Sequence, residues 1–378
     1  IRMYSLIREV ARAHEVTILS LAGPGDEPAL TERALGPTIA VRVSWTGRQP
    51  PSAAKRLGQL RSLFSLRSAQ YRQMVQPALQ AALDRLLRER PVDLVQLEFS
   101  LTGLYRLPRG IPTVLDVHNV EHDLVRQVAR RGSPARRWFN AVEWRKLRRD
   151  ELEAWRRASA CLATSAADGR TIESATGRPA VIIPNGIDPD RLPRSPLALG
   201  RPERLLFVGT LRYWPNAEGV RFFVIQVLPR LRDRIPGIEF VVAGADPSPD
   251  LVELAREPGV RLVGRVPDTR PWLEQAGVVV VPLLSGSGTR LKVLEAFAAG
   301  RPVVAPDAGG LKDAVEDGAT GFLVRAHPEA IAAACLRLLE DPELRRRMGE
   351  QARARAARYD VARTTAQLAA FYGELCGA

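Results

Sequence analysis

Short apolar runs alternate with amphipathic stretches along almost the whole chain. Runs typical of buried strands occupy 14–22, 92–100, 112–120, 159–166, 180–186, 204–210, 237–245, 259–266, 277–284, 301–307 and 321–324. Segments with helical periodicity lie between them, for example 216–234. Because strands that alternate with helices form parallel sheets covered on both faces, the pattern predicts an α/β fold.

One stretch interrupts this alternation and divides the chain. Residues 193–203 are rich in proline and arginine and lack periodicity, which is typical of a linker. We therefore expect two doubly wound, Rossmann-like domains, 1–192 and 204–357, which face each other across a cleft. Ligands of such sheets bind beyond the carboxyl ends of the strands. The chain opens inside the helical stretch 1–13, so we also expect that the first domain lacks its first strand.

Composition narrows the class of protein. The chain has 378 residues, 46% of them hydrophobic, which is enough for two domains with cores. Its three cysteines show no metal-ligand spacing, which favours a reducing cytoplasm. No apolar run reaches the roughly 20 residues of a membrane span, and no signal peptide is evident. We expect a cytoplasmic protein, either in solution or peripheral on the inner face of the membrane.

The net charge is +13, and basic residues are densest in one segment. Residues 130–159 carry a dense set of arginines interleaved with Trp138, Phe139, Trp144 and Trp155. This composition suits an anionic membrane surface or a polyanion. It also suits a solvated helix face whose tryptophans lie in the core. A nucleic-acid partner is disfavoured, because no stacking platform or nucleic-acid motif is present.

The stretch GSGTRLKVLEAFAAG (286–300) places charges where an apolar helix begins. Glycines between a strand and a helix allow backbone N–H groups to converge on an anion at the helix N-terminus. Arg290 and Lys292 lie in the first turn, where the helix dipole disfavours cations unless an anion is bound. Glu295, one turn later, offers a carboxylate to sugar hydroxyls. These residues match the phosphates and ribose of a nucleotide.

A second interpretation of this stretch stays open. Lys292 and Glu295 have the spacing of an ordinary ion pair on a helix, which contributes only a few tenths of a kcal/mol. The glycines are also compatible with a plain loop. Asp-Pro-Asp at 188–190 resembles a metal-binding pattern, but its position favours a turn.

The run from 282 to 324 resembles the nucleotide-sugar-binding region of family-4 glycosyltransferases, which have the GT-B fold. The resemblance extends over most of the chain and includes HEVTILSL near the start, LDVHNVE in the middle, IPNGID (183–188) and FVGTLRYWPN (207–216). It implies that the last helix, 358–378, packs back on the first domain, although an independent capping helix is an alternative. It also implies that a glycine-rich first loop is missing.

Site residues follow from the resemblance position by position. Glu295 matches a glutamate that binds ribose, and Arg290 and Lys292 match basic residues placed against the phosphates. His118 matches a histidine that faces the donor sugar. The backbone positions implied at the donor are Gly209 and Thr210 in the cleft, Arg265 and Val266 near the base, and Gly288 and Thr289 at the diphosphate.

The chain also departs from the family pattern. Ser287 stands where many members carry a glutamate that contacts the donor sugar, so that carboxylate contact is lost. Thr210 replaces an arginine, and no lysine lies near Pro215; Arg290 and Lys292 are expected to supply this charge. Asp313 replaces a more usual glutamate.

The resemblance implies a retaining glycosyltransferase that transfers a sugar from a UDP- or GDP-sugar to a glycan or lipid-linked acceptor in cell-surface polysaccharide or glycolipid synthesis. No cofactor or metal is expected, because Arg290 and Lys292 would meet the phosphate charge. A nucleotide-sugar epimerase of the same fold and a non-catalytic nucleotide- or polyanion-binding protein remain alternatives. Ser287 argues against the epimerase, which needs carboxylates at the sugar.

Overall fold

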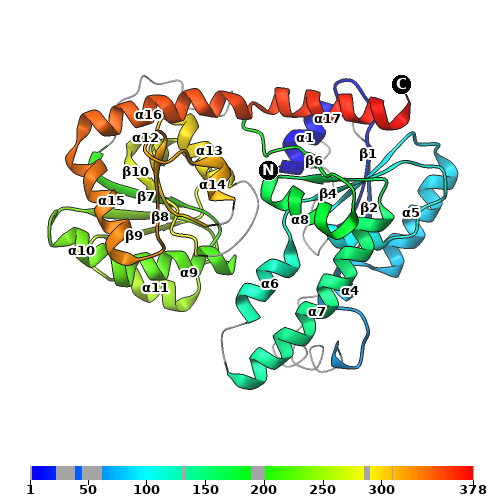
Figure 1. Cartoon of the computed structure of the whole chain (residues 1–378), viewed down its shortest axis with the longest axis horizontal. Helices are drawn as coiled ribbons and strands as arrows, with labels where there is room; N and C mark the ends of the chain where they lie inside the picture. The colour runs from blue at the N-terminus through cyan, green and yellow to red at the C-terminus, as the bar shows by residue number, and fades with distance from the viewer. Residues whose placement is uncertain are drawn as a thin grey trace. The chain divides into compact units, whose positions relative to one another are not determined.

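A computed structural model describes residues 2–22, 39–44, 62–129, 133–188, 201–284, 290–308 and 310–377. The chain divides into two compact units, residues 1–184 with 364–378, and residues 185–363. Each unit has a parallel sheet with helices around it, as the alternating sequence pattern predicts (Figure 1). The predicted fold class, two Rossmann-like domains, is confirmed.

The first unit holds a four-stranded parallel sheet in the order β3-β4-β5-β6 and a parallel pair, β1-β2. The strands are β1 Thr17–Ala22, β2 Ile39–Ser44, β3 Val95–Glu98, β4 Thr113–Val117, β5 Ala160–Ala163 and β6 Val181–Ile182. The helices are α1 Arg2–Val10, α4 Ala69–Met74, α5 Pro77–Glu89, the 3₁₀ helix η1 Ser100–Leu104, α6 Glu121–Ala129, α7 Pro134–Arg157 and α8 Ala166–Thr176. Every residue of β4 is buried, as expected for a strand covered on both faces.

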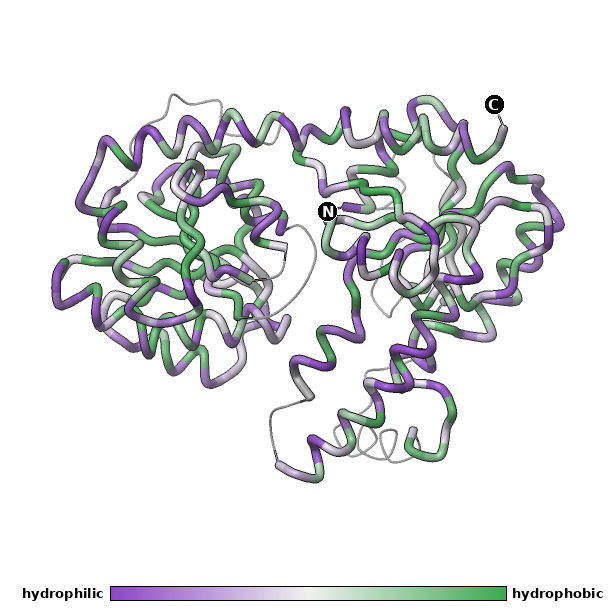
Figure 2. Tube along the Cα trace, in the orientation of Figure 1, coloured by the Kyte–Doolittle hydropathy of each residue, from purple (hydrophilic) through white to green (hydrophobic). Residues whose placement is uncertain are grey.

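The second unit is built on a six-stranded parallel sheet in the order β12-β11-β10-β7-β8-β9. The strands are β7 Arg201–Val208, β8 Glu239–Ala243, β9 Val260–Gly264, β10 Ala276–Val280, β11 Val303–Pro306 and β12 Gly321–Val324. In register, Leu206 of β7 pairs with Val241 of β8 on one side and with Val279 of β10 on the other. The apolar strands form the centre of the unit and are green in Figure 2.

Helices cover both faces of this sheet. They are α9 Trp214–Phe222, the π-helical turn η3 Phe223–Val227, α10 Leu228–Arg232, α11 Pro249–Leu254, α12 Arg270–Gln275, α13 Leu291–Ala298, α14 Leu311–Ala314, α15 Pro328–Glu340, α16 Pro342–Ala356 and the 3₁₀ turn η4 Ala357–Tyr359. In Figure 1, α9 and α11 lie on one face and α13 and α14 on the other. The helix expected over 216–234 is present as two α-helical segments, α9 and α10, which the π-helical turn η3 joins without a break.

Two boundaries differ from the expected ones. The predicted linker extended to residue 203, but β7 already begins at Arg201 because its first residue pairs with Ala276 of β10. The first unit ends at Pro184 instead of residue 192, since Ile187 pairs with the backbone of Tyr359 and Val361 in the second unit. The last helix, α17 Val361–Cys376, passes from the second unit into the first, where Leu368 joins a core cluster with Leu6 and Val114.

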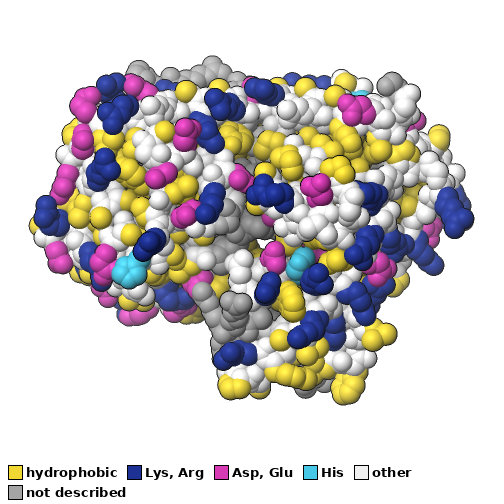
Figure 3. Space-filling model, in the orientation of Figure 1, with side chains coloured by type: hydrophobic (Ala, Val, Ile, Leu, Met, Phe, Trp, Pro, Cys, Tyr) yellow, Lys and Arg dark blue, Asp and Glu magenta, His cyan; other side chains and the backbone are white. Residues whose placement is uncertain are grey.

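The basic segment forms the long helix α7, capped at its start by Ser133. Trp155 lies fully in the core, so for this residue the interpretation of a membrane-facing tryptophan is wrong. Trp138 is 61% exposed and lies among exposed arginines. Figure 3 shows basic and hydrophobic side chains side by side on the projection that α6 and α7 build. Within the part of the chain that the structure describes, every helix is too short or too polar to span a bilayer.

Candidate functional site

The strand order of the second unit creates a place where ligands bind in such folds. From β7 the chain proceeds to β8 and β9 on one side, then returns to β10 on the other side of β7. The segments that leave β7 and β10 therefore diverge, and in folds of this kind ligands bind in the crevice expected at the carboxyl ends of these strands. Gly209 and Thr210 follow β7, and α13 follows β10. The topology thus brings together two segments that are about 80 residues apart in sequence.

Lys292 joins these two segments. Its Nζ donates a 2.7 Å hydrogen bond to Oδ1 of Asn216 at the start of α9, and it lies 4.2 Å from the centroid of the Phe207 ring. The Nδ2 of Asn216 donates to the carbonyl oxygen of Thr210 at 2.7 Å. The amino group from α13 is therefore held directly at the end of β7.

Gly209 makes room for this amino group. Its φ of +155° is a conformation that residues with a side chain rarely adopt. A Cβ at this position would lie 2.7 Å from Nζ of Lys292 and 2.8 Å from Nδ2 of Asn216. Any residue larger than glycine would have to displace one of them.

The electrostatics of this cluster favour an anion. Burial lowers the pKa of Lys292 well below its ordinary value, the charge of Arg290 lowers it further, and Glu295 opposes both effects. The Nε of Arg290 is buried and has no hydrogen-bond partner among the described residues. In that same part of the chain, no carboxylate lies within ion-pair distance of Arg290 or Lys292. Two neighbouring cations without a paired carboxylate can bind a diphosphate, which supplies the missing charge.

The other residues predicted to bind a donor belong to the second unit. Glu295 is half-buried one turn after Lys292 on α13, and Arg290 is the residue immediately before that helix. Arg265 and Val266 follow β9, where Gly264 accepts a hydrogen bond from Gly244 at the end of β8. Ser287, Gly288 and Thr289 lie outside the described residues. Of the predicted site residues in this unit, those that the structure brings together at the ends of β7 and β10 are Gly209, Thr210, Arg290, Lys292 and Glu295.

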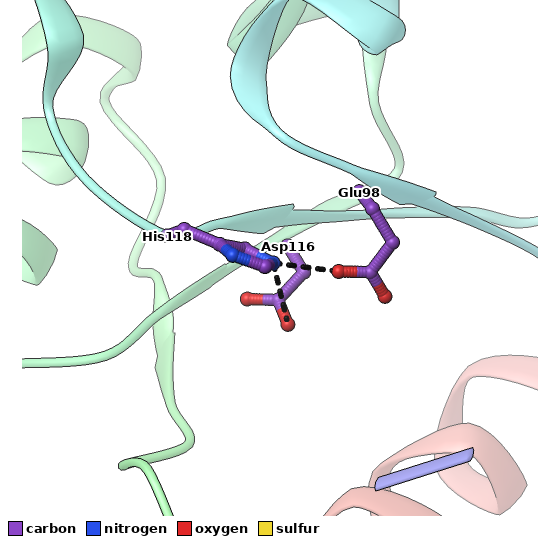
Figure 4. Close-up of side chains that lie close together, drawn as sticks. All are labelled: Glu98, Asp116 and His118. Atoms are coloured by element: carbon purple, nitrogen blue, oxygen red, sulfur yellow. Dashed lines mark hydrogen bonds and ion pairs between the residues drawn. The ribbon is translucent and has the colours of Figure 1, made fainter. Parts of the chain in front are cut away.

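His118 belongs to the first unit, where it follows β4. Its Nε2 lies 2.6 Å from Oε2 of Glu98, the last residue of the adjacent strand β3 (Figure 4). The ring of Phe99 lies against the imidazole, with 4.3 Å between the ring centroids. Because β3 and β4 are parallel neighbours, their carboxyl ends bring these side chains to one edge of the sheet.

Asp116 completes a group of three potential metal ligands with Glu98 and His118, whose ligand atoms lie within 4.8 Å of one another. The Asp116 carboxylate is fully buried and accepts hydrogen bonds from Nε and Nη2 of Arg2 at 2.9 and 3.1 Å. Burial raises the pKa of Asp116, and Arg2 opposes this effect. The guanidinium bound to this carboxylate opposes a cation at the same place.

A second acidic group lies just beyond His118. Glu151 of α7 accepts hydrogen bonds from the backbone N–H groups of Glu121 and His122, and its Oε2 lies 2.7 Å from Nδ1 of His122. Burial and the charge of Glu151 raise the pKa of Glu121 to about 7, although a hydrogen bond from Asn119 opposes the shift. Glu121 therefore changes its charge near neutral pH.

Sequence reasoning missed three residues of these clusters. Asn216 carries no local signal for contact with Lys292, since 76 residues separate them. Glu98 could have been found, because it ends the strand before that of His118. The carboxyl ends of neighbouring parallel strands lie side by side, so the two side chains are expected to be close. Arg2 lies in a helical stretch that gave no indication of a buried ion pair with Asp116.

Two family models together match most of the chain. Residues 1–191 match the Glycosyltransferase Family 4 model, and residues 202–341 match the model of Glycosyl transferases group 1. A phosphatidyl-myo-inositol mannosyltransferase from Mycolicibacterium smegmatis is 33% identical over 212 residues, which are 54% of each chain. The chain thus spans about half the length of the relatives that it matches in sequence.

Solved structures resemble the chain over nearly its full length. A sucrose-phosphate synthase from Thermosynechococcus elongatus has a TM-score of 0.73 and 19% identity, covering 98% of this chain and 91% of that one. Anabaena Alr3699/HepE in complex with UDP-glucose has a TM-score of 0.68 and 18% identity, covering 98% and 94%. At these identities the likeness shows the shared fold.

Proposed function

Because the chain belongs to Glycosyltransferase Family 4, we propose that it transfers a sugar from a UDP- or GDP-sugar to a glycan or lipid-linked acceptor, with retention at the anomeric carbon. The observation that carries the proposal is the pair of cations, Arg290 and Lys292, at the crevice beyond β7 and β10. A nucleoside diphosphate would supply the two negative charges that this pair lacks. The Anabaena neighbour binds UDP-glucose, which supports a nucleotide-sugar donor.

Arg290 and Lys292 would also act in the chemical step. Negative charge develops on the leaving diphosphate, and preorganised cations in a partly dehydrated site stabilise such charge. This role requires no divalent ion, so we propose a metal-independent transfer. Glu295 would hold the ribose through its carboxylate. His118, from the first unit, would hydrogen-bond the donor sugar.

We propose that the acceptor is lipid-linked or lies close to a membrane. On α7, Trp138 is 61% exposed, and two apolar residues of the segment before α4, Phe64 and Leu66, are 94% and 79% exposed. Arg149 of α7 donates a hydrogen bond to the carbonyl oxygen of Leu66, so this apolar segment lies beside the basic helix. Exposed aromatic and basic side chains in one surface suit anionic headgroups. We therefore propose peripheral binding to the inner face of the cell membrane and a role in cell-surface polysaccharide or glycolipid synthesis.

Calorimetric titration with UDP, GDP, ADP and CDP tests the donor site. We expect one nucleotide to bind the wild type at micromolar concentration, and Arg290→Ala and Glu295→Ala to lose that binding. Arg256→Ala is the matched control, because Arg256 is an exposed arginine of the same unit paired with Glu253. Failure of all four nucleotides to bind folded protein would contradict the proposal.

Two further measurements test the finer claims. Proton NMR of the glycoside product, through the coupling constant of its anomeric proton, reports whether the anomeric configuration of the donor is retained. Turnover in excess chelator reports whether a divalent ion is needed. Inverted product or loss of turnover in chelator would each overturn the corresponding claim.

A further inference from the structure

A chain of hydrogen bonds in the first unit leads from α17 to His118. The hydroxyl of Tyr372 donates to Oε1 of Gln96, and Nε2 of Gln96 donates to Oε1 of Glu98 at 2.6 Å. The other carboxylate oxygen of Glu98, Oε2, lies 2.6 Å from Nε2 of His118. Four side chains, from β3, from the residue after β4 and from α17, are thus linked in series.

The direction of each bond in this chain follows from chemistry. An ionised carboxylate can only accept hydrogen bonds, so Glu98 requires the amide nitrogen of Gln96 on one side and an N–H of His118 on the other. The amide oxygen of Gln96 then faces Tyr372. Burial and the nearby charges of Glu98 and Asp116 raise the pKa of Tyr372, which keeps its hydroxyl protonated and donating.

Glu98, and not Asp116, is the carboxylate that accepts from His118. The Oδ2 of Asp116 lies 3.8 Å from Nε2, beyond hydrogen-bond distance, and this carboxylate is bound by Arg2. Figure 4 shows the Glu98 carboxylate directed at the edge of the imidazole ring. In the neutral ring the hydrogen is therefore on Nε2, and the basic nitrogen is Nδ1.

The backbone after Glu98 adds a second constraint on the ring. Consecutive strand residues normally point to opposite faces of a sheet, yet Glu98 and Phe99 both contact His118. This is possible because Phe99 has a φ of +71°, a conformation that a bulky residue rarely adopts. Strained backbone of this kind occurs preferentially at functional sites.

We propose that Glu98 is a positioning residue that holds His118 with its hydrogen on Nε2 and its ring in one orientation. Gln96 and Tyr372 orient Glu98 in turn. What the oriented histidine does rests on the proposed function, in which His118 contacts the donor sugar. The tautomer itself does not depend on that function.

Nitrogen-15 NMR of the protein labelled at histidine tests the proposal without any substrate. The chain has four histidines, and His118→Asn assigns the signal. At a pH where the ring is neutral, we expect wild type to show hydrogen on Nε2. In Glu98→Gln, Gln96 still donates to the oxygen of the new amide, whose NH2 then faces His118 and moves the ring hydrogen to Nδ1. Glu98→Ala should give a mixture of both tautomers.

Asp123→Asn is the matched control, since Asp123 is a carboxylate 3.9 Å from Nε2 of another histidine, His122. It should leave the His118 signal unchanged. Hydrogen on Nδ1 in the wild type, or an unchanged tautomer in both Glu98 variants, would overturn the proposal.

Kinetics separate this proposal from the proposed function. If His118 acts on the donor sugar, Glu98→Gln should lower kcat by about tenfold or more while leaving KM for the donor nearly constant. A changed tautomer with unchanged kcat would support the control of the ring by Glu98 and contradict the role of His118 at the sugar.

Discussion

Lys292 donates a hydrogen bond to Asn216 across 76 residues of sequence, and this contact joins the segments that follow β7 and β10. The Nδ2 of Asn216 donates a second hydrogen bond, to the carbonyl oxygen of Thr210. The lysine amino group is thereby fixed at the carboxyl end of β7, next to the place in the second sheet where the strand order reverses. A flexible side chain that is already fixed loses less entropy when an anion binds.

Gly209→Ala should weaken donor binding without unfolding the protein. The added Cβ would lie 2.7 Å from Nζ of Lys292, so the amino group must move away from the crevice. We expect a loss of about 1–3 kcal/mol in the binding free energy of the nucleotide, measured by calorimetry. Gly237→Ala is the control, because a Cβ at Gly237 has no neighbour within 4 Å. Equal affinities for both variants and the wild type would contradict this prediction.

Binding of a nucleotide sugar should weaken as the pH rises. Lys292 has a lowered pKa in the free protein, whereas the bound diphosphate favours its charged form. Above the pKa of the free protein, binding therefore takes up a proton, and the affinity falls by up to about tenfold per pH unit. Calorimetry in two buffers with different ionisation enthalpies measures this uptake.

Lys292→Met should bind weakly at every pH and take up no proton. Lys312→Met, which removes an exposed lysine paired with Asp307, should retain the pH dependence of the wild type. A pH dependence that persists in Lys292→Met would assign the proton to another group.

Glu121 should destabilise the folded protein as the pH rises through neutrality. Its pKa is about 7 in the folded state against an ordinary value of 4.5, so the folded state holds more protons between these values and stability falls with increasing pH. Glu121→Gln should remove this fall and gain about 1–3 kcal/mol at pH 8. Thermal unfolding midpoints between pH 5 and 8 measure the effect, and Glu173→Gln, on an exposed glutamate of the same unit, should not reproduce it.

Vesicles that contain anionic lipid should retain the protein at low salt and release it at high salt. The exposed arginines of α7 attract the headgroups, and Trp138 inserts its ring at the interface. Cosedimentation measures the bound fraction, which Trp138→Ala should reduce. Zwitterionic vesicles are the control. If anionic vesicles fail to retain the protein at low salt, the proposed membrane surface is wrong.

The apolar strands were predictable because burial on both faces demands continuous runs such as GVVVVPLL, which forms β10 and its exit. β2 was missed, since IAVRVS is a short alternating run with an arginine inside it. The cations Arg290 and Lys292 stood out because cations are unexpected at a helix start. The contact of Lys292 with Asn216 depends on strand order, which a local pattern does not encode. The contact of His118 with Glu98 also depends on strand order, although the position of Glu98 at a strand end was a usable signal.

The pairing of Ile187 with Tyr359 and Val361 has a consequence for the chain as a whole. The backbone enters the second unit after Pro184 and leaves it after Arg363. Both places are close in sequence to the bridge between Ile187 and Asp360. Residues 185–363 are therefore an insertion within the first unit, with neighbouring ends. A segment whose ends lie together can be excised, or rejoined in permuted order, without stretching its backbone. The proposed nucleotide binding can therefore be tested in this segment apart from the rest of the chain.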